Sequence, residues 1–166
     1  MRSKAAIGNH PIHPALVPIP IGAFFLALVG DVMHAAAPAD PFWYDLAFAA
    51  IGIGLIAAVV AAVFGAIDYL GVKMDTATFR LATFHAALNS AALILYAVTF
   101  MLRRNRIAEA GPRWPAAMAL ELLAFVVLGV SGWIGGKLAF ERRVGVVERE
   151  NDEAGASPAA RPARRA

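Results

Sequence analysis

The chain has 166 residues, of which 60% are hydrophobic and only 16% are charged, and its mean hydropathy is +0.63. Soluble domains carry about 25% charged residues, so this composition excludes an ordinary soluble enzyme and indicates a membrane protein. The formal net charge is +3, but the arginines stand at segment ends and in the tail, which favours a role in bilayer orientation over nucleic-acid binding.

The first apolar segment, residues 14–36, follows the unusual stretch "GNHPIHPALVPIP". Proline is tolerated in the first turn of a helix, because that N–H has no partner there. Pro18 and Pro20 lie further in, so we expect either a late helix start or a distorted first turn. The segment also resembles the core of a signal peptide, but it is about as long as a true span and contains Asp31, so we interpret it as a transmembrane helix.

Three further apolar segments are long enough to cross a membrane, since about 20 apolar residues span the hydrocarbon. They cover residues 42–70, 77–102 and 116–140. Short turns between spans force antiparallel neighbours, so we predict an all-α, integral membrane antiparallel four-helix bundle over residues 1–147. Residues 148–166 form a charged Ala/Pro/Arg tail without apolar periodicity, and we predict that this tail is disordered.

In such a bundle both termini lie on one side of the membrane, here called side A, and the loops after the first and third helices lie on side B. Seven Lys and Arg residues flank the spans on side A, and four flank them on side B. The positive-inside rule therefore predicts that both termini are cytoplasmic in a multi-pass protein of the cell membrane.

Segments far apart in the sequence bring polar residues to side A of this bundle. The residues are His10, His13, Asp68, His85, Asn89 and Lys137. His85 and Asn89 share one helix face because they are four residues apart. We expect the side chains to gather in one polar cluster with Lys137 at its rim.

The histidines of this cluster have two interpretations each. An ionisable residue inside a span is costly, which makes His85 the strongest functional candidate, and imidazole binds haem iron, zinc or copper. An interhelical hydrogen bond, worth about 0.6 kcal/mol in membrane proteins, explains His85 equally well. An extended HPIHP segment can wrap His10 and His13 around a metal. Alternatively both are interfacial histidines beside a proline cap. This alternative is favoured for His10, whereas the two interpretations of His13 have about equal weight.

Two further residues support the predicted cluster. Asp68 can orient His85 or His13 by hydrogen bonding, or it can form an ion pair with Lys137, which is slightly favoured. Asn89 is expected to hydrogen-bond within the cluster.

Polar residues also fall toward side B, namely Asp31, His34 and Glu121. Asp31 and His34 are three residues apart and share a face, and with the side A cluster they can outline a proton path. A position near a wet interface is the favoured interpretation of His34 and Glu121. Asp31 lies deeper and stays a candidate.

Small residues are expected to allow close approach of helices. They include the pair Gly132 and Gly136, and the group around Gly52, Gly54 and Ala61. No cysteine, Ser-His-Asp arrangement, HExxH or phosphate-binding loop is found in the sequence, so catalytic residues are unknown and it stays open whether the protein is an enzyme.

The stretches "HPIHPALVPIPIGAFFLALVGDV", "GAIDYL", "HAALN" and "GGKLAFERRVGV" resemble, in this order, the bacterial membrane family DUF2231. The resemblance covers residues 8–147, and the HPxHP start and GG-x-L ending are its distinctive pieces. It implies an inner-membrane protein of unknown function. Fusion of some family members to Rieske iron–sulfur or cytochrome c domains suggests electron transfer, although neither domain occurs in these 166 residues.

Three functions stay open from the sequence. The first is a redox-associated module that binds haem b or another transition metal through His13 and His85, with His10 as a further metal ligand and Asp68, Asn89 and Lys137 around them. Its difficulty is depth, because His85 lies about 12 Å into its helix whereas His13 stands at a helix start. The partners would be the lipid bilayer and redox proteins of the Rieske or cytochrome c type, or a homo-oligomer.

The second function is a proton- or ion-conducting or transport subunit that uses Asp31, Asp68 and His85, and four spans would then require an oligomer. The third is a structural membrane protein without a cofactor, whose polar cluster only specifies helix packing.

Overall fold

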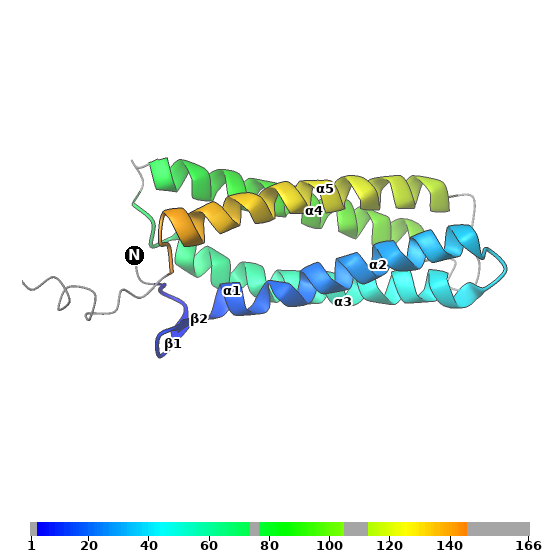
Figure 1. Cartoon of the computed structure of the whole chain (residues 1–166), viewed down its shortest axis with the longest axis horizontal. Coiled ribbons are helices and arrows are strands. Elements are labelled where there is room, and N and C mark those ends of the chain that lie inside the picture. The colour runs from blue at the N-terminus through cyan, green and yellow to red at the C-terminus, as the bar shows by residue number, and fades with distance from the viewer. Residues whose placement is uncertain (1–2, 74–76, 105–112, 146–166) are drawn as a thin grey trace, which may run out of the picture.

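The computed structural model describes residues 3–73, 77–104 and 113–145, and within them four helices are long and apolar enough to cross a membrane. They are α2 (Pro18–Ala36), α3 (Pro41–Tyr69), α4 (Ala77–Arg103) and α5 (Trp114–Gly136). Figure 1 shows them running up and down, with both ends of the described chain at the same end of the bundle. The predicted all-α membrane bundle is therefore confirmed, while the predicted disordered tail, residues 148–166, lies outside the described residues.

Side A carries residues 3–11, 70–73 and 137–145, and side B carries residues 37–40 between α2 and α3. At side A the chain begins with a small antiparallel hairpin of β1 (Ala6–Ile7) and β2 (His10–Pro11). The turn between these strands uses Gly8 at φ 61°, a conformation that glycine adopts without strain.

The first span begins with a break in the helix, as its prolines predicted. A short helix α1 (Ile12–Leu16) precedes α2, and Val17 lies between them. Pro18 and Pro20 have no N–H to donate, so two bonds of a continuous helix are missing at this point. The distorted start keeps α1 on side A beside α3, which decides where His13 lies (Figure 1).

The last span also differs from its prediction at both ends. α5 starts at Trp114, two residues before the predicted start, because Pro115 suits the first turn of a helix. After Gly136 the chain continues as a π-helical turn, η1 (Lys137–Glu141).

The bundle is built from two helix hairpins, with α2 packed mainly on α3 and α4 mainly on α5 (Figure 1). The hairpins meet in a core contributed by all four helices. Its buried residues are Phe24, Ala27, Ala50, Ile51, Tyr96 and Ala124. At its centre the rings of Phe24 and Tyr96 stack with centroids 3.7 Å apart, so one aromatic pair joins the hairpins.

The predicted glycine contacts are confirmed in one place and wrong in another. A Cβ on Gly52 or Gly54 would meet the ring of Phe100 or Phe24 at 3.2 or 2.5 Å. A Cβ on Gly132 or Gly136 would meet nothing within 4 Å in the described part of the chain. Gly132 and Gly136 therefore do not mediate helix packing in the described part of the chain, because the neighbouring helix contacts another face of α5.

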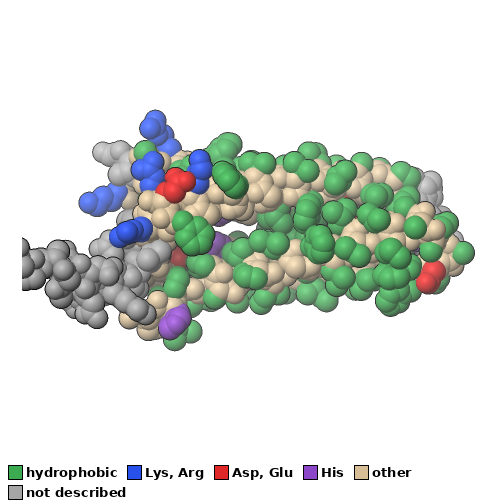
Figure 2. Space-filling model, viewed as in Figure 1, with side chains coloured by type: hydrophobic (Ala, Val, Ile, Leu, Met, Phe, Trp, Pro, Cys, Tyr) green, Lys and Arg blue, Asp and Glu red, His purple; other side chains and the backbone are tan. Residues whose placement is uncertain are grey.

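The outer surface fits a lipid environment. Figure 2 shows apolar side chains along the length of the bundle and basic side chains gathered at side A. The exposed apolar residues come from all four long helices and include Ile56, Ile94 and Val126. Lipid would cover these residues, whereas water and headgroups would meet the charged end.

A substitution at Gly30 tests how closely α2 and α3 approach each other. A Cβ at Gly30 would lie 2.9 Å from the backbone oxygen of Trp43. We expect Gly30→Val to destabilise the protein by about 1–3 kcal/mol, since backbone cannot yield as a flexible side chain does. Thermal unfolding of the purified protein in detergent measures this. Gly22→Val is the matched control, because Gly22 lies on the same helix with nothing within 4 Å. Equal losses in both variants would contradict the close approach.

Candidate functional site

His13 docks on α3 through its ring. Its Nδ1 donates to the backbone oxygen of Ala61 at 2.8 Å, and because a carbonyl only accepts, the hydrogen must be on Nδ1. In the neutral ring this leaves the lone pair on Nε2. The ring lies against Gly65, where a Cβ would come within 2.9 Å of Nδ1. Glycine at this position therefore makes room for the imidazole.

His85 docks on α5 in the same way. Its Nδ1 donates to the backbone oxygen of Ser131 at 2.9 Å, and its ring lies against Gly135, where a Cβ would come within 2.9 Å of Cε1. The Ser131 hydroxyl donates to the backbone oxygen of His85 at 3.2 Å and holds the two helices together at this level. In both cases the accepting carbonyl precedes the glycine by four residues, one helical turn.

The two imidazoles lie at a comparable depth, which removes the difficulty seen in the sequence. The acceptor of His13, Ala61, lies eight residues before the end of α3 at Tyr69, and His85 lies eight residues after the start of α4 at Ala77. Each is about 12 Å from its helix end. The distorted start of the first span is what brings His13 this far in.

Asn89 hydrogen-bonds within the cluster. Its Nδ2 lies 3.1 Å from His85 Nε2 and 3.0 Å from the backbone oxygen of His85. The amide has two hydrogens, so it donates to both acceptors. This arrangement agrees with a His85 ring whose hydrogen is on Nδ1.

Asp68 holds the N-terminal segment and bonds neither imidazole. Its Oδ1 accepts from Ser3 Oγ at 2.7 Å and from the Ala5 N–H at 3.0 Å. The backbone oxygen of Ala5 in turn accepts from the N–H of Ile12, which is the residue before His13. Asp68 therefore acts on His13 indirectly, by fixing the segment from which α1 starts.

The remaining predicted side A residues stand apart. His10 is exposed on β2, and the described residues contain no group of three or more His, Asp or Glu side chains that can hold a metal ion. Lys137 is half-buried at the start of η1, and no ion pair joins it to Asp68 in the described part of the chain.

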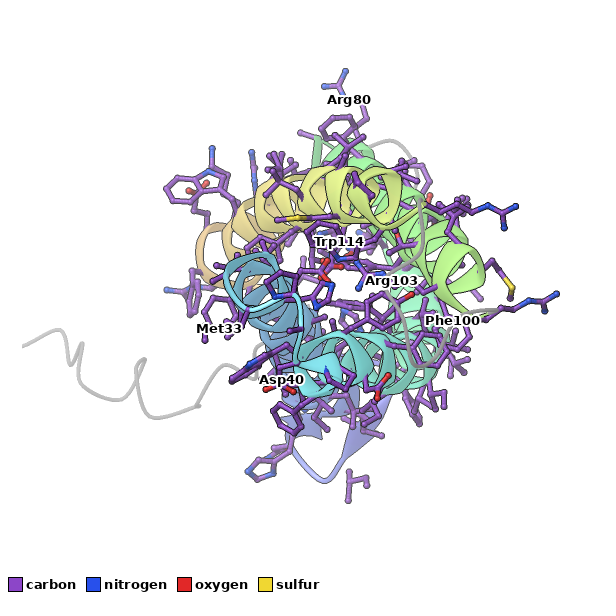
Figure 3. The ribbon with its side chains drawn as sticks, turned by 90° about the vertical axis from the view of Figure 1, so that its right-hand side faces the viewer. Met33, Asp40, Arg80, Phe100, Arg103 and Trp114 are labelled. Atoms are coloured by element: carbon purple, nitrogen blue, oxygen red, sulfur yellow. The ribbon has the colours of Figure 1, made fainter. Side chains whose placement is uncertain are left out.

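A second polar cluster, the Asp31–Arg103–Glu121 cluster, lies toward side B. Arg103 donates from Nη1 and Nη2 to the two carboxylate oxygens of Asp31, and Nη2 also donates to Glu121 Oε2 at 2.7 Å. Trp114 Nε1 donates to Asp31 Oδ1 at 3.2 Å. In Figure 3 Arg103 and Trp114 lie inside the ring of helices, whereas Arg80 points outward. The cluster joins α2, α4 and α5 across the hairpins.

The prediction that His34 and Glu121 lie at a wet interface is wrong. Their relative exposures are 4% and 0%, because they pack inside the ring of helices rather than at its rim. The His34 ring meets Trp114 edge-on with centroids 5.1 Å apart and Tyr44 at 5.7 Å. Asp31, which was left as a candidate, is fully buried.

Arg103 is the important residue that sequence reasoning missed, because it is one of the four basic residues that were counted only as flanking the spans on side B. A signal for it exists in the spacing of α4. Ala92, Tyr96, Thr99 and Arg103 are all buried and recur every three or four residues, which is the period of one helix face. Arg103 therefore extends the buried stripe, while Arg104 is exposed.

Comparison with known proteins gives a family without an assigned activity. Residues 9–148 match the family model DUF2231, described as a predicted membrane protein. No curated protein and no solved structure matches the chain.

Replacing Arg103 tests the Asp31–Arg103–Glu121 cluster. We expect Arg103→Leu to destabilise the protein by about 3–5 kcal/mol, since it leaves buried carboxylates without their partner. Unfolding in detergent, followed by circular dichroism, measures the loss. Arg104→Leu is the neighbouring control and should change stability by less than about 0.5 kcal/mol, because Arg104 is exposed. A tolerated Arg103→Leu would show that the cluster contributes little to the fold.

Proposed function

Because the chain belongs to the DUF2231 family of membrane proteins, whose description assigns no activity, we propose a function from the site: a small membrane redox module that holds haem b between His13 and His85. The observation that carries this proposal is the matched docking of the two imidazoles. Each comes from the first part of its hairpin, donates from Nδ1 to a backbone carbonyl of the second helix, and rests against a glycine.

The chemistry of the two rings would suit them to hold the iron of a haem. A ligating histidine normally donates its other ring N–H to a carbonyl or carboxylate, which fixes the tautomer and strengthens the donor. The carbonyls of Ala61 and Ser131 serve His13 and His85 in this way and leave Nε2 as the ligand atom. Two histidines on different hairpins at one depth could serve as the two protein ligands of haem b.

The small number of ligands favours haem over a bare metal ion. Zinc takes four ligands in most protein sites, at least three of them from the protein. The described residues hold no group of three or more His, Asp or Glu side chains that can bind a metal, whereas a haem iron already held by its porphyrin would need fewer protein ligands. We therefore prefer haem b to zinc or copper, and His10 has no place in the proposed site.

The surrounding residues support His13 and His85 in this function. Asn89 can release His85 Nε2 because it keeps the backbone oxygen of His85 as an acceptor. Asp68 fixes the segment before His13, and Lys137 lies at the side A rim. The haem would supply one-electron transfer, and redox proteins of the Rieske or cytochrome c type are the proposed partners.

Loss of either ring tests the proposal. In purified protein supplied with haem during expression, we expect a Soret band that disappears in His13→Ala and in His85→Ala. His10→Ala is the control and should retain the band, since His10 is exposed on β2. Absorption spectra and haem-to-protein ratios give the result. A folded wild-type protein without a Soret band would overturn the haem site, and the histidines would then serve helix packing or ion binding.

We also infer that side A faces the cytoplasm, so that both termini and the histidine pair lie toward that side of the inner membrane. The bias of basic residues toward side A supports this, and Arg103 on side B is neutralised by its carboxylates. Reporter fusions to the C-terminus should be active only with a cytoplasmic reporter, and fusions within residues 105–112 only with a periplasmic one. The reverse pattern would contradict the orientation.

A further inference from the structure

The Asp31–Arg103–Glu121 cluster does not balance in charge if both acids are ionised. Two carboxylates meet one guanidinium, and the three side chains are at most 1% exposed. A net charge buried in a bilayer protein is costly, since neither water nor a counter-ion reaches it. One further positive charge is needed for neutrality, and a proton is the smallest carrier.

Unpartnered atoms in the same cluster point to this missing proton. Glu121 Oε1 is buried without a hydrogen-bond partner, although Oε2 of the same carboxyl accepts from Arg103. His34 Nδ1 is buried without a partner beside Trp114, whose Nε1 donates to Asp31. Hydrogen bonds from donors stabilise a buried carboxylate, so a carboxyl with one oxygen that accepts none is poorly stabilised as an anion and favours binding a proton.

We propose that Asp31 and Glu121 together hold one exchangeable proton, so that the Asp31–Arg103–Glu121 cluster is a buried proton-binding site. Arg103 Nη2 contacts both carboxyls, which brings the two acids beside each other. When one of them takes up a proton, a carboxylate becomes a carboxylic acid and the cluster becomes neutral. When the proton leaves, the cluster carries one negative charge. This site does not depend on the proposed haem.

His34 connects the site with side B. It lies one turn beyond Asp31 toward the end of α2 at Ala36, with a ring nitrogen that has no partner. The imidazole can accept a proton that arrives from the side B end on one nitrogen and release the proton of its other nitrogen toward the acids. The ring is then unchanged in charge, and one proton has moved inward.

Other ionisable groups around the cluster are considered in the test. The groups on the neighbouring elements are His34 of α2, Tyr44 and Asp45 of α3, and Tyr96 of α4. Asp45 is the rival position for a proton, because its Oδ1 is also buried without a partner. The tyrosines do not give the carbonyl signal of a carboxylic acid.

Infrared absorption of the full-length protein in lipid at neutral pH tests the proposal. We expect the C=O stretch of a buried carboxylic acid, shifted in D₂O. Glu121→Gln and Asp31→Asn should each abolish it, since either leaves one carboxylate balanced by Arg103. The same balance predicts that both variants fold, which circular dichroism checks. Asp45→Asn is the matched control and should keep the signal.

Several results would overturn the shared proton. They are a folded wild type without the carboxylic acid signal, a signal that survives both Glu121→Gln and Asp31→Asn, and a signal lost in Asp45→Asn. The role of His34 has its own measurement. His34→Phe should slow deuterium uptake by the acid several-fold while the signal itself remains, and an unchanged rate would remove His34 from the path.

Discussion

A guanidinium inside a membrane protein must be paired with acids, and Arg103 uses its Nη1 and Nη2 for this by joining the two helix hairpins. Its partners are Asp31 of the first hairpin and Glu121 of the second, and all three side chains are buried. Because each partner comes from a different helix, the bonds form only when α2, α4 and α5 are correctly aligned. The stacked rings of Phe24 and Tyr96 then complete the contact in the middle of the bundle.

The polar side chains at the two ends of the bundle have different kinds of bonding partners. Toward side B the charged side chains pair with one another in a closed cluster. Toward side A, His13 and His85 are half-buried, and each is bound to a helix of its own hairpin rather than to the other hairpin. A cluster of buried apolar residues at this end comes from α4, α5, η1 and the turn after α3. Side B therefore fixes the fold, and side A is the end where a ligand can be held between the hairpins.

Much of this arrangement could be predicted from the sequence, and the remainder has identifiable causes. The spans follow from hydropathy, and the candidacy of His85 follows from the cost of an ionisable group in lipid. Arg103 was misjudged because a charged residue at the end of a span suits a loop as well as a buried pair. Only the positions of Asp31 and Glu121 on other helices distinguish the two. Similarly, Asp68 was expected beside a histidine, but its partner Ser3 comes from a segment whose path the sequence does not reveal.

The matched docking of His13 and His85 also lay beyond sequence reasoning. The carbonyl acceptors of Ala61 and Ser131 are backbone atoms, which leave no trace in residue identity. Gly65 and Gly135 carry a faint signal, but Gly132 and Gly136 carry the same signal and have open space instead. Which glycine receives a ring depends on helix rotation, and that is set by tertiary packing.

Because Arg103 joins the two hairpins near one end of the molecule, a small change in the angle between the hairpins gives a larger displacement at the other end. His85 lies eighteen residues before Arg103 on α4, a distance of about 27 Å along the helix. With the bundle clamped at Arg103, a tilt of about 3° between the hairpins separates their far ends by about 1.4 Å over that length. Small adjustments at the clamped end are thus amplified at the histidine end, where the spacing of two ring nitrogens is most sensitive to them.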